Sequence, residues 1–563
     1  MLSELLYNNW NKQFPRTGPI HVGKGVLQGD CLSPLLFNMI VNTLIKTIDQ
    51  EKIKCMGYNF CETLSPRHWF QFADDSALVT STVQDSQLLL NVFTKWCTWA
   101  NLIVRIDKCK TFGMKKNGNT TSQFLPYLRI NDEMIPPVEM HESFNYLGKI
   151  FSFKMGVETI KKDITERFNC YIEKLNMLPM HPKNKLLVIS KFVYSKIRWE
   201  FSIYNFGVTW VTQNLDSIIK EYVKRWLHLP QSANFSHLYL PVKQLGLKFS
   251  LPSDIFKNSQ LTTRNILKNS KSNDITEIHK STQYKHIAEE SLLTKTNTIR
   301  PRDGLKNETI EQISRSLGQL KEQNIILKMI QQHCLSSSIV EWQRVVDKLP
   351  ENLFVFIRKA LIFCLPNNSN LARWKKSVDS ACGLCKTNTQ TQLHILNNCQ
   401  SSVISGRYTW RHNSVLTTLC NYLTQLPEFT LFADIPGYQN PSIFFKRYRP
   451  DIVIINCRKM IILELTICFE TNLEKSRNYK KEKYHDLEDD CIDERWDIEK
   501  VFIEVSSLGF VTKNIKELKS IIKDHNTYKR LVNKMTETAI RASFYIYTKR
   551  NKLWDEPSLL NFI

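Results

Sequence analysis

The sequence predicts a multidomain protein of the α/β class, in which helices and strands are mixed along most of the chain. At 563 residues the chain is long enough for roughly three or four domains. Apolar residues recur at helical spacing over residues 33–48 and 85–100, and a short apolar hairpin pattern lies between them at residues 69–80. A β-rich run begins near residue 451 and leads into a basic helical stretch.

The remaining segments differ in composition. Residues 156–245 have a mainly helical pattern. Residues 258–310 are rich in Lys, Asn, Ser and Thr, which is typical of a linker or a loosely ordered segment. A second helical stretch covers residues 310–376, and a last α/β domain runs from about residue 403 to the end.

The charge balance points to a polyanionic partner. The chain has 76 Lys and Arg against 54 Asp and Glu, a net charge of +22, and a pI near 9.3. Nucleic acid is the commonest partner of such a surface. The alternative is a basic surface that serves only solubility.

Cysteine usage and hydropathy indicate a reducing compartment. The 15 cysteines are scattered, the first residues do not form a signal peptide, and no apolar run approaches the ~20 residues of a membrane span. We therefore expect reduced thiols, a location in the nucleus or also the cytoplasm, and no membrane partner. Clustered cysteines in such a chain favour a metal site over disulfides.

Two adjacent carboxylates, Asp74 and Asp75, interrupt the apolar pattern of residues 69–80. Two such charges ~4 Å apart repel by up to ~4 kcal/mol at an effective dielectric near 20. A divalent metal ion would neutralise them. The alternative is an acidic hairpin tip in solvent.

A glycine-containing loop precedes this pair by about 45 residues. Its sequence is QGDCLSP, in which Asp30, Ser33 and Pro34 can begin the helix over residues 33–48. With the Asp pair, this loop resembles the palm of reverse transcriptases, in particular those of non-LTR retrotransposons. The resemblance implies that the loop lines the incoming nucleotide and the template through Gln28, Gly29, Asp30, Ser33 and Pro34.

The same resemblance implies catalytic roles. Asp74 and Asp75 would hold Mg²⁺ for a two-metal transfer from dNTPs, with RNA as template. Lys108, in RIDKCKTFGM, matches a basic residue that faces the departing phosphate, although any Lys at a strand end would look the same. A primer-grip turn is matched by Tyr146, Leu147 and Gly148.

One departure affects the expected activity. The family places a further metal-binding Asp well upstream of the QGD loop, and none of the 27 residues before Gln28 is an Asp. We therefore expect this polypeptide by itself to polymerise poorly or not at all.

A cysteine cluster follows in CGLCKTNTQTQLHILNNC. Cys382, Cys385, His394 and Cys399 have the types and spacing of a tetrahedral structural zinc site. Zinc binding supplies ~10–16 kcal/mol in small modules of this kind. The alternative is four unrelated core residues.

Directly after the cluster, cations alternate with aromatic residues in GRYTWRHN. This pattern suits nucleic-acid contact through Arg407, Arg411 and His412, although a helix start with solvated arginines fits equally well. Retrotransposon proteins of the same family carry a comparable Arg-His-Asn after their zinc knuckle.

The last motif is a predicted β-hairpin with two acids. A turn at Cys457-Arg458-Lys459 places Asp451 opposite residue 465, one step from Glu464. An unpaired Glu464 among aliphatic residues would be costly, and a metal ion would resolve this. The alternative is a buried hairpin with an incidental Pro-Asp.

This motif resembles the PD-(D/E)xK core of restriction-like endonucleases, in which two acids hold Mg²⁺ and a lysine orients the attacking water. Thr466 stands at the usual lysine position, and in the retrotransposon branch the lysine is displaced into the following helix. We expect Lys480 to take that role, with Lys483 as the second choice.

Together the resemblances imply the C-terminal part of a site-specific non-LTR retrotransposon protein that nicks a DNA target and copies RNA from the nick. The helical thumb would hold the RNA–DNA hybrid through Lys183, Lys185 and Lys191. Three hypotheses remain: both activities, an endonuclease with an impaired polymerase, or a non-catalytic nucleic-acid-binding remnant. The expected domains are a partial palm (1–151), a helical thumb (152–250), a helical linker (251–376), a CCHC zinc knuckle (377–402) and the endonuclease (403–563).

Overall fold

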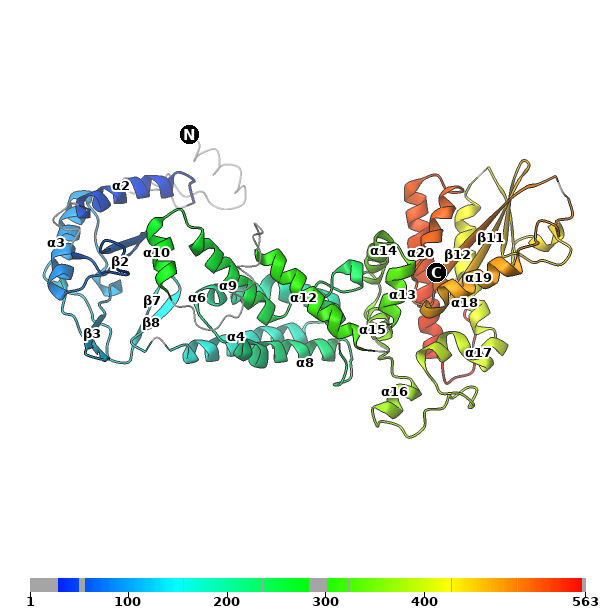
Figure 1. The fold of residues 1–563 in the computed structure, drawn as a ribbon, viewed down its shortest axis with the longest axis horizontal. Coiled ribbons are helices and arrows are strands. Elements are labelled where there is room, and N and C mark those ends of the chain that lie inside the picture. Colours follow the sequence, from blue (N-terminus) through cyan, green and yellow to red (C-terminus); the bar gives the residue numbers. More distant parts are fainter. Residues whose placement is uncertain are drawn as a thin grey trace, which may run out of the picture. The chain divides into compact units, whose positions relative to one another are not determined.

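The computed structural model describes residues 29–49, 56–154, 156–234, 236–282, 301–320, 325–426, 428–493 and 495–558. The chain forms two compact units (Figure 1). The first comprises Met1–Glu158 with Arg264–Lys285, and the second comprises Thr159–Thr263 with His286–Ile563.

The first unit is built around two helices and a hairpin. Helix α2 (Ser33–Ile48) and helix α3 (Val83–Ala100) share a core with the hairpin of β1 (Trp69–Phe72) and β2 (Asp75–Leu78). The helices and the hairpin predicted from periodicity are therefore confirmed. The buried side chains of this core are Val41, Leu44, Ile48, Leu89, Trp96 and Cys97.

Three further hairpins complete the strands described in this unit. Each is a separate two-stranded sheet. They are β3 (Gly113–Asn117) with β4 (Thr120–Phe124), β5 (Arg129–Ile130) with β6 (Glu133–Met134), and β7 (Ser143–Tyr146) with β8 (Lys149–Ser152).

Helix α10 (Asn273–Ser281) also belongs to the first unit, although it lies more than 100 residues further along the chain. Arg67 forms an ion pair with Asp274 at 2.6 Å, and the Thr63 hydroxyl donates to Glu277 at 3.4 Å. Residues expected to be loosely ordered are here part of a packed unit.

The second unit begins with a helical region, as the sequence predicted. Its buried side chains include Phe168, Phe201 and Leu215. The helices are α4 (Glu158–Met177), α5 (Pro182–Val188), α6 (Arg198–Ile203), α7 (Val208–Val211) and α8 (Ser217–Trp226), with π-helical turns at Ile189–Val193 and Thr212–Asp216.

Helix α9 (Pro252–Lys268) corrects the prediction of loose order from residue 258. Phe256 and Leu261 are fully buried. The Gln260 side chain donates to the carbonyls of Phe201 at 2.7 Å and Tyr204 at 3.0 Å. Ser259 is buried on this face as well, whereas Asn258 is half-buried and Lys268 is exposed.

The described part of residues 310–376 is mainly helical, as predicted, but the first helix already begins at Pro301 and the region packs against its neighbours. Trp342 donates to the Leu508 carbonyl at 2.8 Å and stacks on Phe510 at 4.1 Å. The fully buried Arg358 donates to the Leu245 carbonyl at 3.1 Å. The helices are α12 (Pro301–Gly318), α13 (Ile325–His333), α14 (Ser336–Val346), α15 (Glu351–Ala360) and α16 (Asn368–Arg373).

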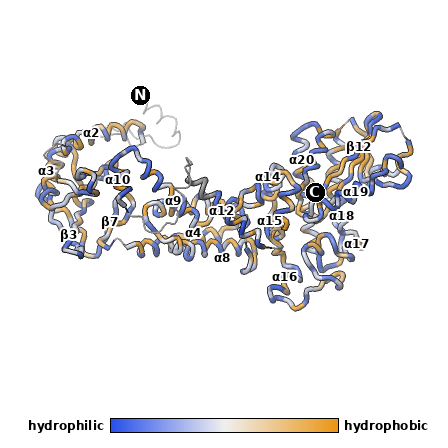
Figure 2. Tube along the Cα trace, viewed as in Figure 1, coloured by the Kyte–Doolittle hydropathy of each residue, from blue (hydrophilic) through white to orange (hydrophobic). Residues whose placement is uncertain are grey.

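The C-terminal region contains one four-stranded sheet, in the order β12-β11-β10-β9. Strands β11 and β12 are parallel and joined through helix α19, whereas the other pairs are antiparallel. Much of the sheet is hydrophobic (Figure 2). The elements are β9 (Thr430–Ala433), β10 (Ile452–Asn456), β11 (Lys459–Cys468), α19 (Leu473–Lys483) and β12 (Asp497–Ser506).

Alternation along β11 divides the core into two layers. Ile461, Leu463 and Leu465 pack with helices α18 (Arg407–Leu423) and α20 (His525–Thr548). Met460 and Ile462 face the opposite layer, together with Tyr484 at the end of α19. Because side chains alternate along a strand, Glu464 belongs to the layer of α19.

Among the described residues, no helix is long and apolar enough to cross a bilayer.

Burial of His237 predicts acid sensitivity of the second unit. The side chain is 1% exposed, and burial, followed by the charge of Arg358, lowers its pKa to about 3. As the pH falls below ~6.5, His237 therefore binds a proton in the unfolded chain but not in the folded chain. This difference lowers the free energy of unfolding by about 1.4 kcal/mol per pH unit. We expect acidification from pH 6.5 to 5 to lower the unfolding free energy less in His237→Gln than in the wild type, as measured by urea denaturation. Equal losses in both proteins would contradict this account.

Candidate active site and metal centre

The first predicted acid pair lies at the tip of the β1–β2 hairpin. Phe72 pairs with Asp75, so Ala73 and Asp74 form the turn, with Ala73 at φ 51°. Both carboxylates are exposed. The acidic pair thus occupies a tight hairpin turn and faces solvent.

The predicted primer-grip turn is a second tight hairpin. Leu147 (φ 49°) and Gly148 (φ 74°) form the turn between Tyr146 and Lys149. Burial, followed by the negative charge of Asp75, raises the pKa of Tyr146. The two hairpin tips are therefore close enough for Asp75 to act on Tyr146 electrostatically.

The loop before α2 is described from Gly29 onward, and Gln28 lies outside the described residues. Gly29 has φ 92°, and Asp30 accepts a hydrogen bond from the Leu32 backbone at 3.0 Å. Ser33 and Pro34 begin the helix, as expected.

Lys108 does not lie at a strand end. It is the last residue of a 3₁₀ turn, Ile106–Lys108, and it is exposed.

The second acid pair is brought together by the β10–β11 hairpin. Asn456 pairs with Lys459, so Cys457 and Arg458 alone form the turn, with Cys457 at φ 54°. A two-residue turn places Asp451 directly opposite Glu464, which corrects the predicted register by one residue. The Asp451 backbone donates to Glu464 Oε1 at 3.0 Å.

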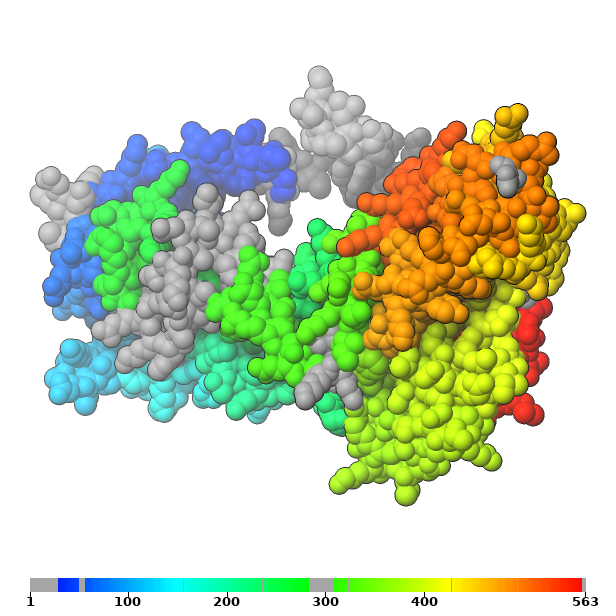
Figure 3. Space-filling model, turned by 45° about the vertical axis from the view of Figure 1, so that its right-hand side comes forward, coloured from blue at the N-terminus to red at the C-terminus, as the bar shows by residue number. Residues whose placement is uncertain are grey.

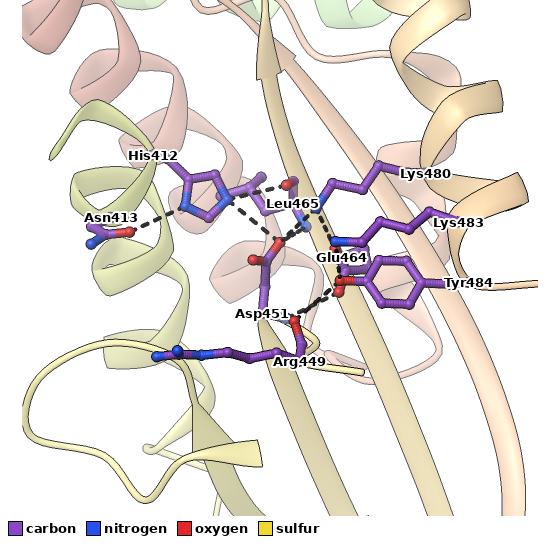
Figure 4. Close-up of polar contacts among 9 residues, drawn as sticks. All are labelled: His412, Asn413, Arg449, Asp451, Glu464, Leu465, Lys480, Lys483 and Tyr484. Carbon is purple, nitrogen blue, oxygen red and sulfur yellow. Dashed lines mark hydrogen bonds and ion pairs between the residues drawn. The ribbon is translucent and has the colours of Figure 1, made fainter. Parts of the chain in front are cut away.

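Helix α19 brings Lys480 to this pair. Its Nζ lies 2.5 Å from Glu464 Oε2 and 3.7 Å from Asp451 Oδ2 (Figure 4). Lys483 instead donates to the Tyr484 hydroxyl at 3.3 Å. Between the two candidate lysines, the geometry favours Lys480.

Burial and charge act on the two acids in opposite directions. Burial, then the charge of Asp451, raises the pKa of Glu464 to about 7, and Lys480 only partly offsets this. Burial alone would raise the pKa of Asp451, but His412 and Lys480 outweigh it and lower that pKa to about 2. A cation at the pair would favour the charged form of Glu464.

His412 belongs to this cluster, and the expectation of nucleic-acid contact did not place it there. Its Nε2 lies 3.4 Å from Asp451 Oδ2 and 3.2 Å from the Leu465 carbonyl (Figure 4). His412 precedes the buried Val415 and Leu416 by three and four residues on α18, so it lies on the same helix face. This helical spacing was the signal in the sequence that could have placed His412 toward the sheet.

Arg407 and Arg411 are corrections, because both are buried. Arg407 donates to the carbonyls of Lys549 at 2.8 Å and Lys552 at 2.7 Å. Arg411, 1% exposed, donates to the Ser543 hydroxyl at 3.1 Å. Neither side chain is available to a phosphate in this structure.

The three lysines expected in the thumb also differ in burial and in their partners. Lys185 is buried and donates to the Asn176 carbonyl at 3.1 Å, which corrects its expected role. Lys183 forms an ion pair with Asp347 at 3.1 Å. Lys191 is exposed.

The cysteine segment brings all four predicted ligands together. The ligand atoms of Cys382, Cys385, His394 and Cys399 lie within 4.8 Å of one another. Cys382 Sγ and Cys399 Sγ are 3.9 Å apart, and Cys385 Sγ and His394 Nε2 are 3.4 Å apart. A tetrahedron with Zn–S near 2.3 Å and Zn–N near 2.0–2.1 Å has edges of roughly 3.5–3.8 Å. The four residues therefore fit zinc.

Backbone and side-chain donors surround the more exposed thiol. Burial would raise the pKa of Cys385, but hydrogen bonds from the Thr387 hydroxyl and from the Asn388 and Thr387 backbones lower it to about 6.

Elsewhere in the described ranges, no other group of three or more His, Cys, Asp or Glu side chains reaches the ligand spacing of the cysteine site. The Asp74–Asp75 pair and the Asp451–Glu464 pair thus each offer a metal ion two side-chain carboxylates.

The cysteine segment is fixed to α18. The Tyr408 hydroxyl donates to the carbonyls of His394 at 3.1 Å and Ile395 at 3.0 Å, and it accepts from the Cys399 backbone at 3.1 Å. In the space-filling view, the yellow-green region, which includes the cysteine segment, borders the orange region, which includes α19 (Figure 3).

Residues 2–151 match the family "Reverse transcriptase (RNA-dependent DNA polymerase)". The chain is also similar to retrovirus-related Pol polyproteins of R2 retrotransposable elements. It is 23% identical to the type-2 element R2DM protein of Drosophila melanogaster over 70% of this chain and 36% of that protein. It is 21% identical to the type-1 element R2 protein of Bradysia coprophila over 90% of this chain and 56% of that protein.

The chain is therefore similar to reverse transcriptases over residues 2–151 and to R2 retrotransposable-element proteins over a larger part of its length. The similarity to the Bradysia coprophila protein extends far beyond residue 151, because it covers 529 residues. The chain spans between about a third and just over half of the length of these two relatives.

Proposed function

We propose that this chain is a retrotransposon-derived enzyme whose C-terminal region nicks DNA and whose N-terminal region is part of an RNA-directed DNA polymerase. The two activities would act in sequence in the nucleus, with the nicked DNA target as primer for copying the element's RNA. The observation that carries the proposal is the cluster at the sheet of the buried Glu464 with the half-buried Asp451 and Lys480.

The donor set at this cluster fits Mg²⁺. Carboxylate oxygens are the ligands that Mg²⁺ prefers, and Glu464 is 1% exposed, so its charge requires a close cation. Bound Mg²⁺ would polarise the scissile phosphodiester and lower the pKa of an attacking water. Asp451 and Glu464 would hold the metal ion, and the Lys480 ammonium would orient the water and neutralise charge that develops on the phosphate.

For the polymerase region, support comes from the family match over residues 2–151 and from the two hairpin tips. Asp74 and Asp75 would hold Mg²⁺ for dNTPs, and Tyr146 to Gly148 would contact the primer end. The loop from Gln28 to Pro34 would face the nucleotide and the RNA template.

Support for binding of an RNA–DNA hybrid comes from the helical region. Phe192, Lys196 and Trp199 follow one another at helical spacing, and the two aromatic side chains are 66% and 53% exposed. Exposed aromatics alternating with cations suit contact with bases and phosphates. Lys191 is exposed beside them and would add a phosphate contact.

We further propose that Cys382, Cys385, His394 and Cys399 hold a structural Zn²⁺. All four coordination positions are filled by protein, so no position is left for substrate. The contacts of Tyr408 indicate that the closed site braces the endonuclease region.

A non-catalytic nucleic-acid-binding remnant is the second candidate. It is favoured by the 2.5 Å ion pair of Lys480 with Glu464, which neutralises the acid without a metal ion. Mg²⁺-dependent nicking of plasmid DNA separates the two candidates.

We expect the full chain to nick supercoiled plasmid DNA only with Mg²⁺ or Mn²⁺. Asp451→Asn and Lys480→Met should each lower the rate by about 10²-fold or more, because each removes a charge that acts on the reacting phosphate. Lys483→Met is the matched control and should stay within about threefold of the wild type. A wild-type chain without nicking activity would favour the remnant, and an equal loss in Lys483→Met would contradict the assignment of Lys480.

Primer extension tests the polymerase region. Among the described residues, no third carboxylate joins Asp74 and Asp75 at ligand spacing. We expect this polypeptide alone to extend a DNA primer on an RNA template at the same background level as Asp75→Asn. Extension that requires Mg²⁺ and disappears in Asp75→Asn would contradict the expectation of an impaired site.

Zinc content tests the cysteine site. Elemental analysis of the purified chain should give one zinc per polypeptide, and Cys382→Ser should lose it and lower the thermal unfolding midpoint, because a buried ligand is removed from the tetrahedron. Cys457→Ser, in the exposed β10–β11 turn, is the control and should keep both values. Full zinc content in Cys382→Ser would refute the assigned ligand set.

A further inference from the structure

We propose that His412 is a positioning residue of the nuclease site, which holds Asp451 and the Leu465 peptide so that one oxygen of Asp451 is left for the metal ion. This inference rests on the proposed endonuclease function. It concerns a side chain of α18, outside the β10–β11–α19 segment that carries the two acids and the lysine.

The need for such a residue arises from the unequal lengths of β10 and β11. The ladder between them ends at Ile452 and Leu463, whereas β11 continues to Cys468. On that side of β11, the Leu465 peptide has passed the last paired residue of β10. A buried backbone donor or acceptor without a partner is costly.

Two side chains contact the Leu465 N–H and carbonyl, where β10 no longer provides backbone partners. The Leu465 N–H donates to Asp451 Oδ2 at 2.8 Å, and the Leu465 carbonyl lies 3.2 Å from His412 Nε2. The same nitrogen is 3.4 Å from Asp451 Oδ2. An Nε2–H that faces two acceptors acts as a donor, so His412 closes a ring with Asp451 and the Leu465 backbone (Figure 4).

These contacts select one oxygen of Asp451. Leu465, His412 and Lys480 all approach Oδ2, at 2.8, 3.4 and 3.7 Å. Glu464 uses Oε1 for the Asp451 backbone and Oε2 for Lys480. In the part of the chain that the structure describes, these contacts of the Asp451 carboxylate thus fall on Oδ2, and Oδ1 is the oxygen left for a metal ion.

The imidazole is itself held in place. Its Nδ1 lies 3.2 Å from Asn413 Oδ1, and the His412 side chain is 23% exposed. Four residues earlier, Tyr408 fixes the start of α18 to the cysteine segment. Val415 and Leu416, both fully buried, fix the next turn in the core beside the sheet. A side chain on such a helix keeps its position, which is what a positioning residue requires.

The test compares His412→Leu with His412→Gln in the full chain. Leu fills space without a donor, whereas the Gln amide can still donate. We expect His412→Leu to raise the Mg²⁺ concentration for half-maximal plasmid nicking by about tenfold or more, and to weaken Mn²⁺ binding in calorimetry by a similar factor, because outer-shell partners contribute about 10–100-fold to metal affinity. His412→Gln should recover most of both losses. Asn421→Leu, an exposed residue near the other end of α18, is the control and should change neither value.

Other outcomes overturn the inference or the function beneath it separately. If Asp451→Asn abolishes nicking but His412→Leu behaves like Asn421→Leu, the positioning role is wrong and the endonuclease stands. If both His412 variants lose Mn²⁺ binding completely, the imidazole is a direct ligand and the positioning role is again wrong. If the wild type neither nicks DNA nor binds Mn²⁺ more tightly than Asp451→Asn, the proposed function itself fails.

Discussion

The arrangement of β10, β11 and α19 depends on the burial of one carboxylate. Glu464 is 1% exposed on a strand whose neighbours are aliphatic, and a charge in such a place costs several kcal/mol unless partners surround it. Its partners come from two elements: the Asp451 backbone from β10 and Lys480 from α19. The position of α19 is thereby tied to the hairpin, and the α18 histidine is tied to it through Asp451.

The two acid pairs illustrate opposite solutions to the same repulsion. Asp74 and Asp75 sit at an exposed turn, where water screens their charges, so the fold of the first unit does not require a cation beside them. Asp451 and Glu464 lie in a site where screening is weak, and the protein supplies Lys480 and His412 itself. A strong demand for charge compensation is therefore built into the second pair only.

Local sequence patterns predicted those features of the fold that depend on interactions between residues close in the sequence. The helices at residues 33–48 and 85–100, the Asp74 hairpin and the proximity of the four Cys and His side chains follow from periodicity, turn chemistry and ligand spacing, and the structure confirms each of these elements. The Asp451–Glu464 register was wrong by one residue, because sequence does not reveal that Cys457 adopts φ 54° and closes a two-residue turn. Their roles in chemistry remain predictions.

Tertiary packing decided what the local patterns could not. The cations and aromatics of GRYTWRHN predict contact with a phosphate backbone. In the structure, however, Arg407 and Arg411 form hydrogen bonds with α20 and the segment after it, and His412 contacts the sheet. A guanidinium that satisfies two backbone carbonyls contributes to the net charge of +22 without contributing a phosphate contact. Net charge thus indicates the class of partner, whereas burial decides which cations can meet it. By that criterion the exposed Lys191 and Lys196 are better placed for nucleic acid than Arg407 and Arg411. The histidine of the same motif, His412, is better placed for Asp451 than for a phosphate.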